Sequence, residues 1–215
     1  MTDAPLKERL QAVEDADSSQ SLIDAVEALA ELKDEGAIDT LIRVLGYNNP
    51  GAAVAAVDGL ISIGEPAATA VLAQIDGYNY GARAWALRVL AGIGDPRGLD
   101  LVLETAKEDF SLSVRRAAAR GLGAIQWEKL SADEQRLGQE KALSILLGVV
   151  KDDPEWVVRY AGIVGLQGVA MAATTLGTEN VVTAVIEALS DRAEQDETPA
   201  VRARAQWAVQ NLEKR

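Results

Sequence analysis

The sequence predicts an all-α solenoid of about six helical hairpins, because one segment recurs, its copies have helical spacing, and proline or glycine separates them. The best copy is SVRRAAARGLGAI (113–125), with echoes at 81–93, 156–169 and 200–212 and a weaker copy at 51–63. Alignment of the four stronger copies places an arginine in one shared column: Arg83, Arg115, Arg159 and Arg202. Such units bury their apolar faces only by stacking on one another, which makes a solenoid.

Each copy is the second helix of a hairpin, since another amphipathic stretch precedes it. The expected hairpins, in chain order, are 6–33, 36–63, 65–93, 95–125, 139–170 and 178–213. Five prolines stand at or near predicted helix starts, where proline is tolerated: Pro50, Pro66, Pro96, Pro154 and Pro199. No linker interrupts the series. We therefore expect a single domain over 1–215, curved, with the second helices on the concave face.

The longest step between aligned arginines coincides with a polar insertion at 126–138. Within it, Ser131 and Glu134 form the S-x-x-E pattern of a capping box, which marks a helix start. We expect this insertion to be a loop with one short helix.

Composition excludes several functions. The net charge of −12 would repel a phosphate backbone, so nucleic acid is not an expected partner. The absence of His and Cys removes Ser-His-Asp and Cys-His nucleophiles and the usual zinc sites, and we expect no metal. Long apolar runs and a signal-like apolar N-terminus are absent, so we expect no membrane span and a cytoplasmic location.

Charge is distributed unevenly. The second helices at 79–93, 111–125, 154–170 and 198–212 hold eight arginines, no lysine and one acidic residue, Glu155. The arginines are Arg83, Arg88, Arg115, Arg116, Arg120, Arg159, Arg202 and Arg204. These stretches also hold five of the nine aromatics: Tyr80, Trp85, Trp156, Tyr160 and Trp207. Arginine beside flat aromatic surface suits a planar ligand with carboxylates, or an acidic protein surface.

The arginines fall into two groups. The four in the shared column are expected to be structural, pairing between repeats. Arg88 and Arg120 each lie five residues after a column arginine, off the packed stripe, so they either clamp two carboxylates of one ligand or form a plain solvated face. Trp207 is expected to be a core residue at the C-terminal end.

The loop DGYNYGARAW (76–85) is unusual for a turn. Asn79 is a good helix N-cap, which explains part of it. A cap has no need of Asp76, Tyr78 and Tyr80. These three residues, together with Asn79, are candidates for a functional role.

The repeats resemble the HEAT family, in which a turn aspartate and the arginine of a Val-Arg pair form a ladder between repeats. Val114-Arg115, Val158-Arg159 and Val201-Arg202 match, with Asp109 and either Asp152 or Asp153 before them. More specifically, GYNYGARAWALRVLAGIGDPRGLDLVLE (77–104) and EDFSLSVRRAAARGLG (108–123) resemble the E/F-type phycobilin lyases, which load bilins onto phycobiliproteins. Length, acidity and repeat number fit the smaller, F-type subunits.

That resemblance implies a heterodimer with a larger E-type subunit. The pair would attach phycocyanobilin, a transferred substrate and not a permanent cofactor, by a thioether to a cysteine of the apo phycocyanin α subunit. A related isomerising branch has a His/Cys motif that this chain lacks. Asp76, Tyr78 and Tyr80 are the expected catalytic residues. The expected bilin-binding residues are Arg88, Arg120, Asn79, Trp85, Arg116, Trp156 and Tyr160.

Two alternatives share these features. One is a non-catalytic HEAT adapter that binds an acidic partner through the arginines, since a fold does not fix a function. The other is a phycobilisome-degradation factor of the same superfamily.

Overall fold

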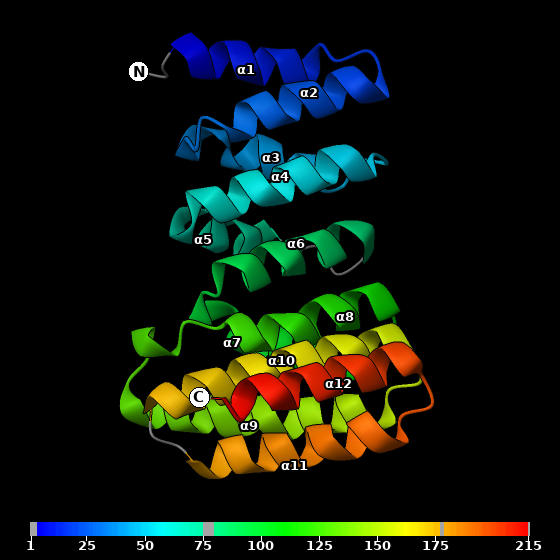
Figure 1. Cartoon of the computed structure of the whole chain (residues 1–215). Coiled ribbons are helices and arrows are strands. Elements are labelled where there is room, and N and C mark those ends of the chain that lie inside the picture. The colour runs from blue at the N-terminus through cyan, green and yellow to red at the C-terminus, as the bar shows by residue number, and fades with distance from the viewer. Residues whose placement is uncertain (1–3, 75–79, 177–178, 215) are drawn as a thin grey trace. The chain divides into compact units, whose positions relative to one another are not determined.

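The computed structural model describes residues 4–74, 80–176 and 179–214, and over these ranges all regular structure is helical (Figure 1). Twelve α-helices in the described residues form six hairpins, which confirms the predicted fold class and repeat number. The chain divides into two compact units, 1–93 and 94–215. The single domain and the curvature expected from the sequence stay predictions.

The first unit contains three hairpins. Their helices are α1 (Ala4–Glu14), α2 (Ser19–Ala30), α3 (Ile38–Val44), α4 (Pro50–Ile63), α5 (Glu65–Gln74) and α6 (Tyr80–Ile93), with the 3-10 turn η1 (Glu35–Ala37) before α3. The second helices α2, α4 and α6 pack side by side, and α3 packs on α5 in the other layer. Leu29, Leu41, Leu60 and Leu87 are fully buried in the core of this unit.

The second unit repeats this plan. Its elements are η2 (Pro96–Gly98), α7 (Leu99–Glu108), α8 (Leu112–Gly121), η3 (Leu122–Ala124), η4 (Trp127–Lys129), α9 (Ala132–Asp152), α10 (Trp156–Leu176), α11 (Glu179–Gln195) and α12 (Pro199–Leu212). One layer contains α7, α9 and α11, and the other contains α8, α10 and α12, with α10 between its neighbours (Figure 1). We call α8, α10 and α12 the B helices of this unit.

Glycines bring α10 unusually close to the end of α8. A Cβ placed on Gly165 would lie 2.3 Å from the Ala119 carbonyl oxygen, and one on Gly168 would lie 2.1 Å from the Gly123 carbonyl oxygen. Both distances are far inside van der Waals contact, and backbone cannot move aside as a flexible side chain can. The spacing of these two B helices therefore depends on residues without side chains.

The long helix α10 passes the length and hydropathy test for a membrane span over Trp156–Thr175, but 61% of that window is buried. It packs against α8, α9, α11 and α12. Its apolar character is explained by its place at the centre of the unit.

The insertion at 126–138 differs from the prediction. It has one 3-10 turn, η4, and its Ala132–Gly138 part forms the first two turns of α9, so it adds length to a repeat helix and contains no separate short helix. The predicted capping box is present, with Ser131 N–H and Oγ donating to Glu134 Oε2 at 2.9 and 2.6 Å. Trp127 is 2% exposed, and a Cβ on Gly138 would lie 2.7 Å from its ring, so the indole packs against the added turns.

Replacement of Gly168 by alanine should lower the free energy of unfolding by about 1–3 kcal/mol, because the new methyl group forces α10 away from η3. Gly148→Ala is the matched control, since a Cβ there has no neighbour within 4 Å. It should be neutral or stabilising by up to about 1 kcal/mol, through helix propensity. Urea unfolding measures both, and equal effects would contradict the close approach.

Candidate ligand-binding site

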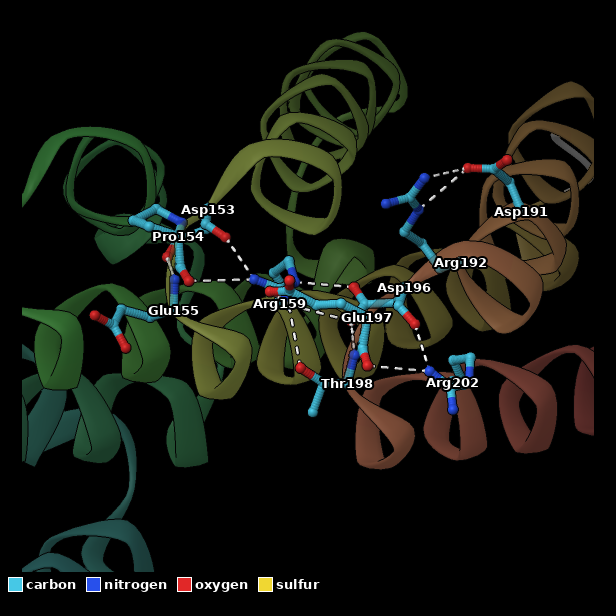
Figure 2. Close-up of polar contacts among 10 residues, drawn as sticks. All are labelled: Asp153, Pro154, Glu155, Arg159, Asp191, Arg192, Asp196, Glu197, Thr198 and Arg202. Atoms are coloured by element: carbon cyan, nitrogen blue, oxygen red, sulfur yellow. Dashed lines mark hydrogen bonds and ion pairs between the residues drawn. The ribbon is translucent and has the colours of Figure 1, made fainter.

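Three of the aligned arginines, each four residues into a B helix, close the turns of their own hairpins. In each case Nη1 donates to two consecutive backbone carbonyls before the helix: Asp109 and Phe110 (2.9 and 3.1 Å) for Arg115, Asp153 and Pro154 (3.0 and 3.3 Å) for Arg159, and Asp196 and Glu197 (2.7 and 3.1 Å) for Arg202. Figure 2 shows the last two of these clamps side by side. The carbonyls satisfied in this way would otherwise lack partners at the turn.

The remaining nitrogens of two of these arginines reach the next repeat. Arg115 Nε and Nη2 donate to Asp153 Oδ2 and Oδ1 at 2.8 and 3.2 Å. Arg159 pairs in the same way with Asp196 at 2.9 and 3.1 Å, as Figure 2 shows. Each aspartate also accepts a backbone hydrogen bond at the start of the next B helix. Asp153 Oδ1 accepts from the Glu155 N–H, and Asp196 Oδ1 accepts from the Thr198 N–H. The predicted inter-repeat pairing is confirmed for Arg115 and Arg159, and the aspartate left open as Asp152 or Asp153 is Asp153.

The Arg159–Asp196 pair is the most buried link, with side chains 7% and 2% exposed. Burial by itself would raise the pKa of Asp196, but the hydrogen bonds from Arg159 and from the Thr198 N–H, with the charges of Arg159 and Arg192, outweigh it and lower that pKa below its usual value. The Asp196 carboxyl hydrogen bond raises the pKa of Arg159 further. Both groups are therefore charged at neutral pH.

A separate set of side chains lies on the B helices of the second unit, away from the ladder. Its members are Arg120 of α8, Tyr160 and Gln167 of α10, and Arg204 and Trp207 of α12, and we call them the arginine–aromatic patch. Arg204 is its centre: Nη2 donates to Gln167 Oε1 at 2.6 Å, and Cζ lies 4.6 Å from the Trp207 ring centroid and 6.0 Å from that of Tyr160. Trp207 is 54% exposed and Tyr160 is 38% exposed, so both offer surface to a ligand.

The patch is electrostatically unbalanced. Burial lowers the pKa of Arg204, Tyr160 opposes that change, and the charge of Arg120 lowers the pKa further. Over the described residues neither arginine forms an ion pair, and Arg204 Nη1 is buried without a hydrogen-bond partner. Two neighbouring cations without a carboxylate make this surface favourable for an anion.

The structure groups the sequence-predicted residues differently from the expectation. Arg120 and Tyr160 belong to the patch, Arg116 is exposed on α8, and Trp156 is 45% exposed at the start of α10. In the first unit, the exposed Arg88 lies with its Cζ 4.5 Å from the ring centroid of the partly exposed Trp85. The predicted pairing of Arg88 with Arg120 joins residues of different units and stays a prediction.

The loop candidates are only partly described. Tyr80 is the first residue of α6. Asp76, Tyr78 and Asn79 lie outside the described residues.

Three members of the patch were missed from the sequence: Gln167, Arg204 and Trp207. The prediction that Trp207 is core was wrong, because its indole stacks on Arg204 and is half exposed. Its position gave a signal: it lies five residues after Arg202, in the column of Arg88 and Arg120. Arg204 lies two residues after Arg202, in the column of Trp85, so α6 and α12 contain the same cation–aromatic pair in opposite order.

Asp196→Ala should lower the free energy of unfolding by about 3–5 kcal/mol at neutral pH, because it removes the only buried carboxylate that pairs with Arg159 among the described residues and leaves the guanidinium with the 82% exposed Glu197 at 3.2 Å. Asp191→Ala is the control, since Asp191 is 45% exposed and pairs only with the adjacent Arg192 among the contacts described. It should change stability by less than about 1 kcal/mol. Urea unfolding of the two variants measures the difference.

This stabilisation should depend on pH. The pKa of Asp196 is lower in the folded state than in the unfolded state. The contribution of its carboxylate to the free energy of unfolding is therefore complete above the pKa of the unfolded state. It is lost as the pH falls through the lower pKa of the folded state. The stability gap between wild type and Asp196→Ala should therefore narrow below about pH 4. A gap that stays constant down to pH 2 would contradict an ionised ladder.

Comparison with known proteins places these features in a family. The family described as HEAT repeats matches residues 6–77 and 73–167. The chain is 52% identical over 205 residues to the phycobilisome maturation protein of Synechococcus elongatus, covering 95% of this chain and 97% of that one. It is 50% identical over 209 residues to the phycocyanin alpha phycocyanobilin lyase CpcF of Synechocystis sp., covering 97% and 95%.

A solved structure gives the same result. A chain from the complex of CpcE and CpcF of phycocyanin lyase from Nostoc sp. matches with a TM-score of 0.73 and 46% identity, over 81% of this chain and 99% of that chain.

Proposed function

This chain belongs to the F-type subunits of the HEAT-repeat phycobilin lyases, and we propose that it is one subunit of an enzyme that attaches phycocyanobilin to phycocyanin. In the reaction, a cysteine thiol of the apo phycocyanin α subunit adds to the ethylidene group of the bilin. A carbon–sulfur bond forms, and the thiol proton goes to the bilin. The bilin is a transferred substrate, without permanent residence on the chain.

The arginine–aromatic patch is the observation that carries this proposal. A linear tetrapyrrole consists of flat, conjugated pyrrole rings and is doubly anionic through its propionates. Exposed Trp207 and Tyr160 rings, beside two arginines that form no ion pair among the described residues, offer the complementary surface. The chain itself has no His or Cys, and it needs none, because the acceptor protein supplies the sulfur. The contribution of the lyase is to hold and orient the reactants, and proper orientation alone lowers a barrier by several kcal/mol, on the order of 7–11 at most.

The roles expected for the other site residues complete the proposal. Asp76 accepts the pyrrole N–H groups and favours the cationic, electrophilic form of the bilin, and Tyr78 or Tyr80 acts as a weak acid or a stacking wall. The remaining contacts come from binding residues on the helices and the loop: Asn79, Trp85, Arg88, Arg116 and Trp156.

The proposed partners follow from the relatives. A solved relative is the complex of CpcE and CpcF, which supports a heterodimer with an E-type subunit. The apo phycocyanin α subunit is the acceptor, and the cytoplasm is the proposed location. The only described helix with the apolar length of a membrane span is the buried α10.

Reconstitution tests the function. Co-expression of this chain with its E-type partner, the apo α subunit and phycocyanobilin should give an α subunit that keeps its bilin after denaturation, as a thioether requires. Omission of either subunit should abolish attachment, and an Arg136→Gln chain should remain fully active because Arg136 is an exposed residue paired with Glu140. Loss of bilin from pre-loaded phycocyanin would instead support a degradation factor. A chain that changes nothing would support an adapter.

Asp76→Asn separates chemistry from binding. If Asp76 favours the cationic bilin, the variant should slow attachment at saturating bilin by about tenfold or more, with an almost unchanged bilin affinity. Stopped-flow absorbance with the assembled heterodimer gives both quantities. An equal loss in affinity and rate would contradict a role in the chemical step.

A further inference from the structure

Three of the six arginines on the B helices of the second unit are already committed to the fold. Arg115, Arg159 and Arg202 hold turn carbonyls, and the first two also hold aspartates. Arg116, Arg120 and Arg204 take no part in the ladder. Arg204 differs from the other two because it is partly buried, whereas Arg116 and Arg120 are exposed.

The position of Arg204 is costly for the unliganded protein. Its only hydrogen-bonded acceptor among the described residues is the neutral Gln167 amide oxygen, and its Nη1 is buried without an acceptor. Arg120 adds repulsion from a like charge. A buried cationic donor that the fold leaves unsatisfied, at a surface with exposed aromatic rings, is the arrangement expected where a ligand supplies the missing acceptor.

The surrounding rings define what kind of anion fits. The Trp207 and Tyr160 ring centroids lie 4.6 and 6.0 Å from Arg204 Cζ, so two flat surfaces adjoin the partly buried charge. A small inorganic anion would leave those rings in water. A flat conjugated molecule with carboxylates would cover the rings and pair with the arginines at the same time.

We propose that Arg120 and Arg204 form a clamp for the propionate groups of the bilin, with Trp207 and Tyr160 as the walls that contact its rings. This inference rests on the proposed function and assigns Arg204 and Trp207 to bilin binding. The close approach of α8 and α10 places Arg120 here: it follows Ala119, whose carbonyl oxygen would lie 2.3 Å from a Cβ on Gly165, two residues before Gln167. Arg204 and Trp207 reach this surface from the far side of α10, so the clamp spans three consecutive B helices.

The covered Nη1 of Arg204 has a consequence for binding. A propionate oxygen reaches this buried atom only if neighbouring side chains shift. Trp207 lies against the guanidinium, and its 54% exposure leaves its side chain room to shift. Bilin binding should therefore change the environment of the Trp207 indole.

The test compares two probes on the assembled heterodimer: phycocyanobilin with free propionates and its dimethyl ester. Absorbance titration should give about a tenfold or greater loss of affinity for the free acid in Arg120→Gln and in Arg204→Gln, because each removes a charge-assisted contact. The ester should bind the variants and the wild type alike. Arg204→Lys keeps the charge but loses the bidentate hydrogen bonding of the guanidinium. Its affinity for the free acid should fall between those of wild type and Arg204→Gln.

Arg136→Gln is the matched control, an exposed arginine of the same unit whose partner is the nearby Glu140. Circular dichroism and melting temperature establish that each variant is folded. Equal losses for the two probes, or affinities in both patch variants equal to that of Arg136→Gln, would overturn the clamp.

Two further outcomes are distinct. In the first, Arg204→Gln co-purifies less with the E-type partner, but the heterodimer that still assembles binds both probes normally. The patch then binds an acidic protein surface, and the clamp is wrong. If the wild-type heterodimer attaches no bilin to the apo α subunit, the proposed function itself fails. Normal attachment by wild type with unaffected patch variants rejects the clamp alone.

Discussion

The buried pair between Arg159 and Asp196 shows the constraint on which the repeats depend. One guanidinium satisfies two carbonyls of its own turn and a carboxylate of the next repeat, and that carboxylate caps the following B helix. Loss of Arg159 removes the donor to two turn carbonyls and the cation beside Asp196, whereas loss of Asp196 removes the buried carboxylate beside Arg159 and the acceptor of the Thr198 N–H. This shared use explains why an arginine and a turn aspartate recur together, and why the intervals between arginines vary while their contacts stay the same.

The ladder also determines which charges are available for function. Arginines in it are neutralised by Asp153 and Asp196, whereas Arg120 and Arg204 have no carboxylate among the described residues. In the first unit, α2 and α4 contain acidic residues and no arginine or lysine, whereas α6 contains Arg83 and Arg88. An acidic chain thus presents a local basic, aromatic surface that suits a carboxylate-bearing ligand, while its net charge disfavours nucleic acid.

Repetition made the fold predictable from the sequence. The column of arginines, the prolines at helix starts and the apolar spacing located all six hairpins and the ladder. Departures from the repeat were harder. Arg204 stands where two other repeats have Ala117 and Ala161, and Trp207 looked like a core residue because large apolar side chains usually are buried. The contact between Arg204 and Trp207 depends on the directions of their side chains, and it shows that the two residues form one surface pair. The sequence predicted a separate short helix where α9 begins. The polar segment Ala132–Gly138 instead continues α9, because Trp127 packs against one side of it.

The central claim is that ladder arginines build the stack while patch arginines bind the bilin. The most direct measurement is a structure of the heterodimer with phycocyanobilin bound. It should show propionate oxygens within hydrogen-bond distance of Arg120 and Arg204, with Trp207 moved against a pyrrole ring and the Arg159–Asp196 pair unchanged. Propionates bound elsewhere, with Arg204 still donating only to Gln167 beneath an unmoved Trp207, would contradict the account.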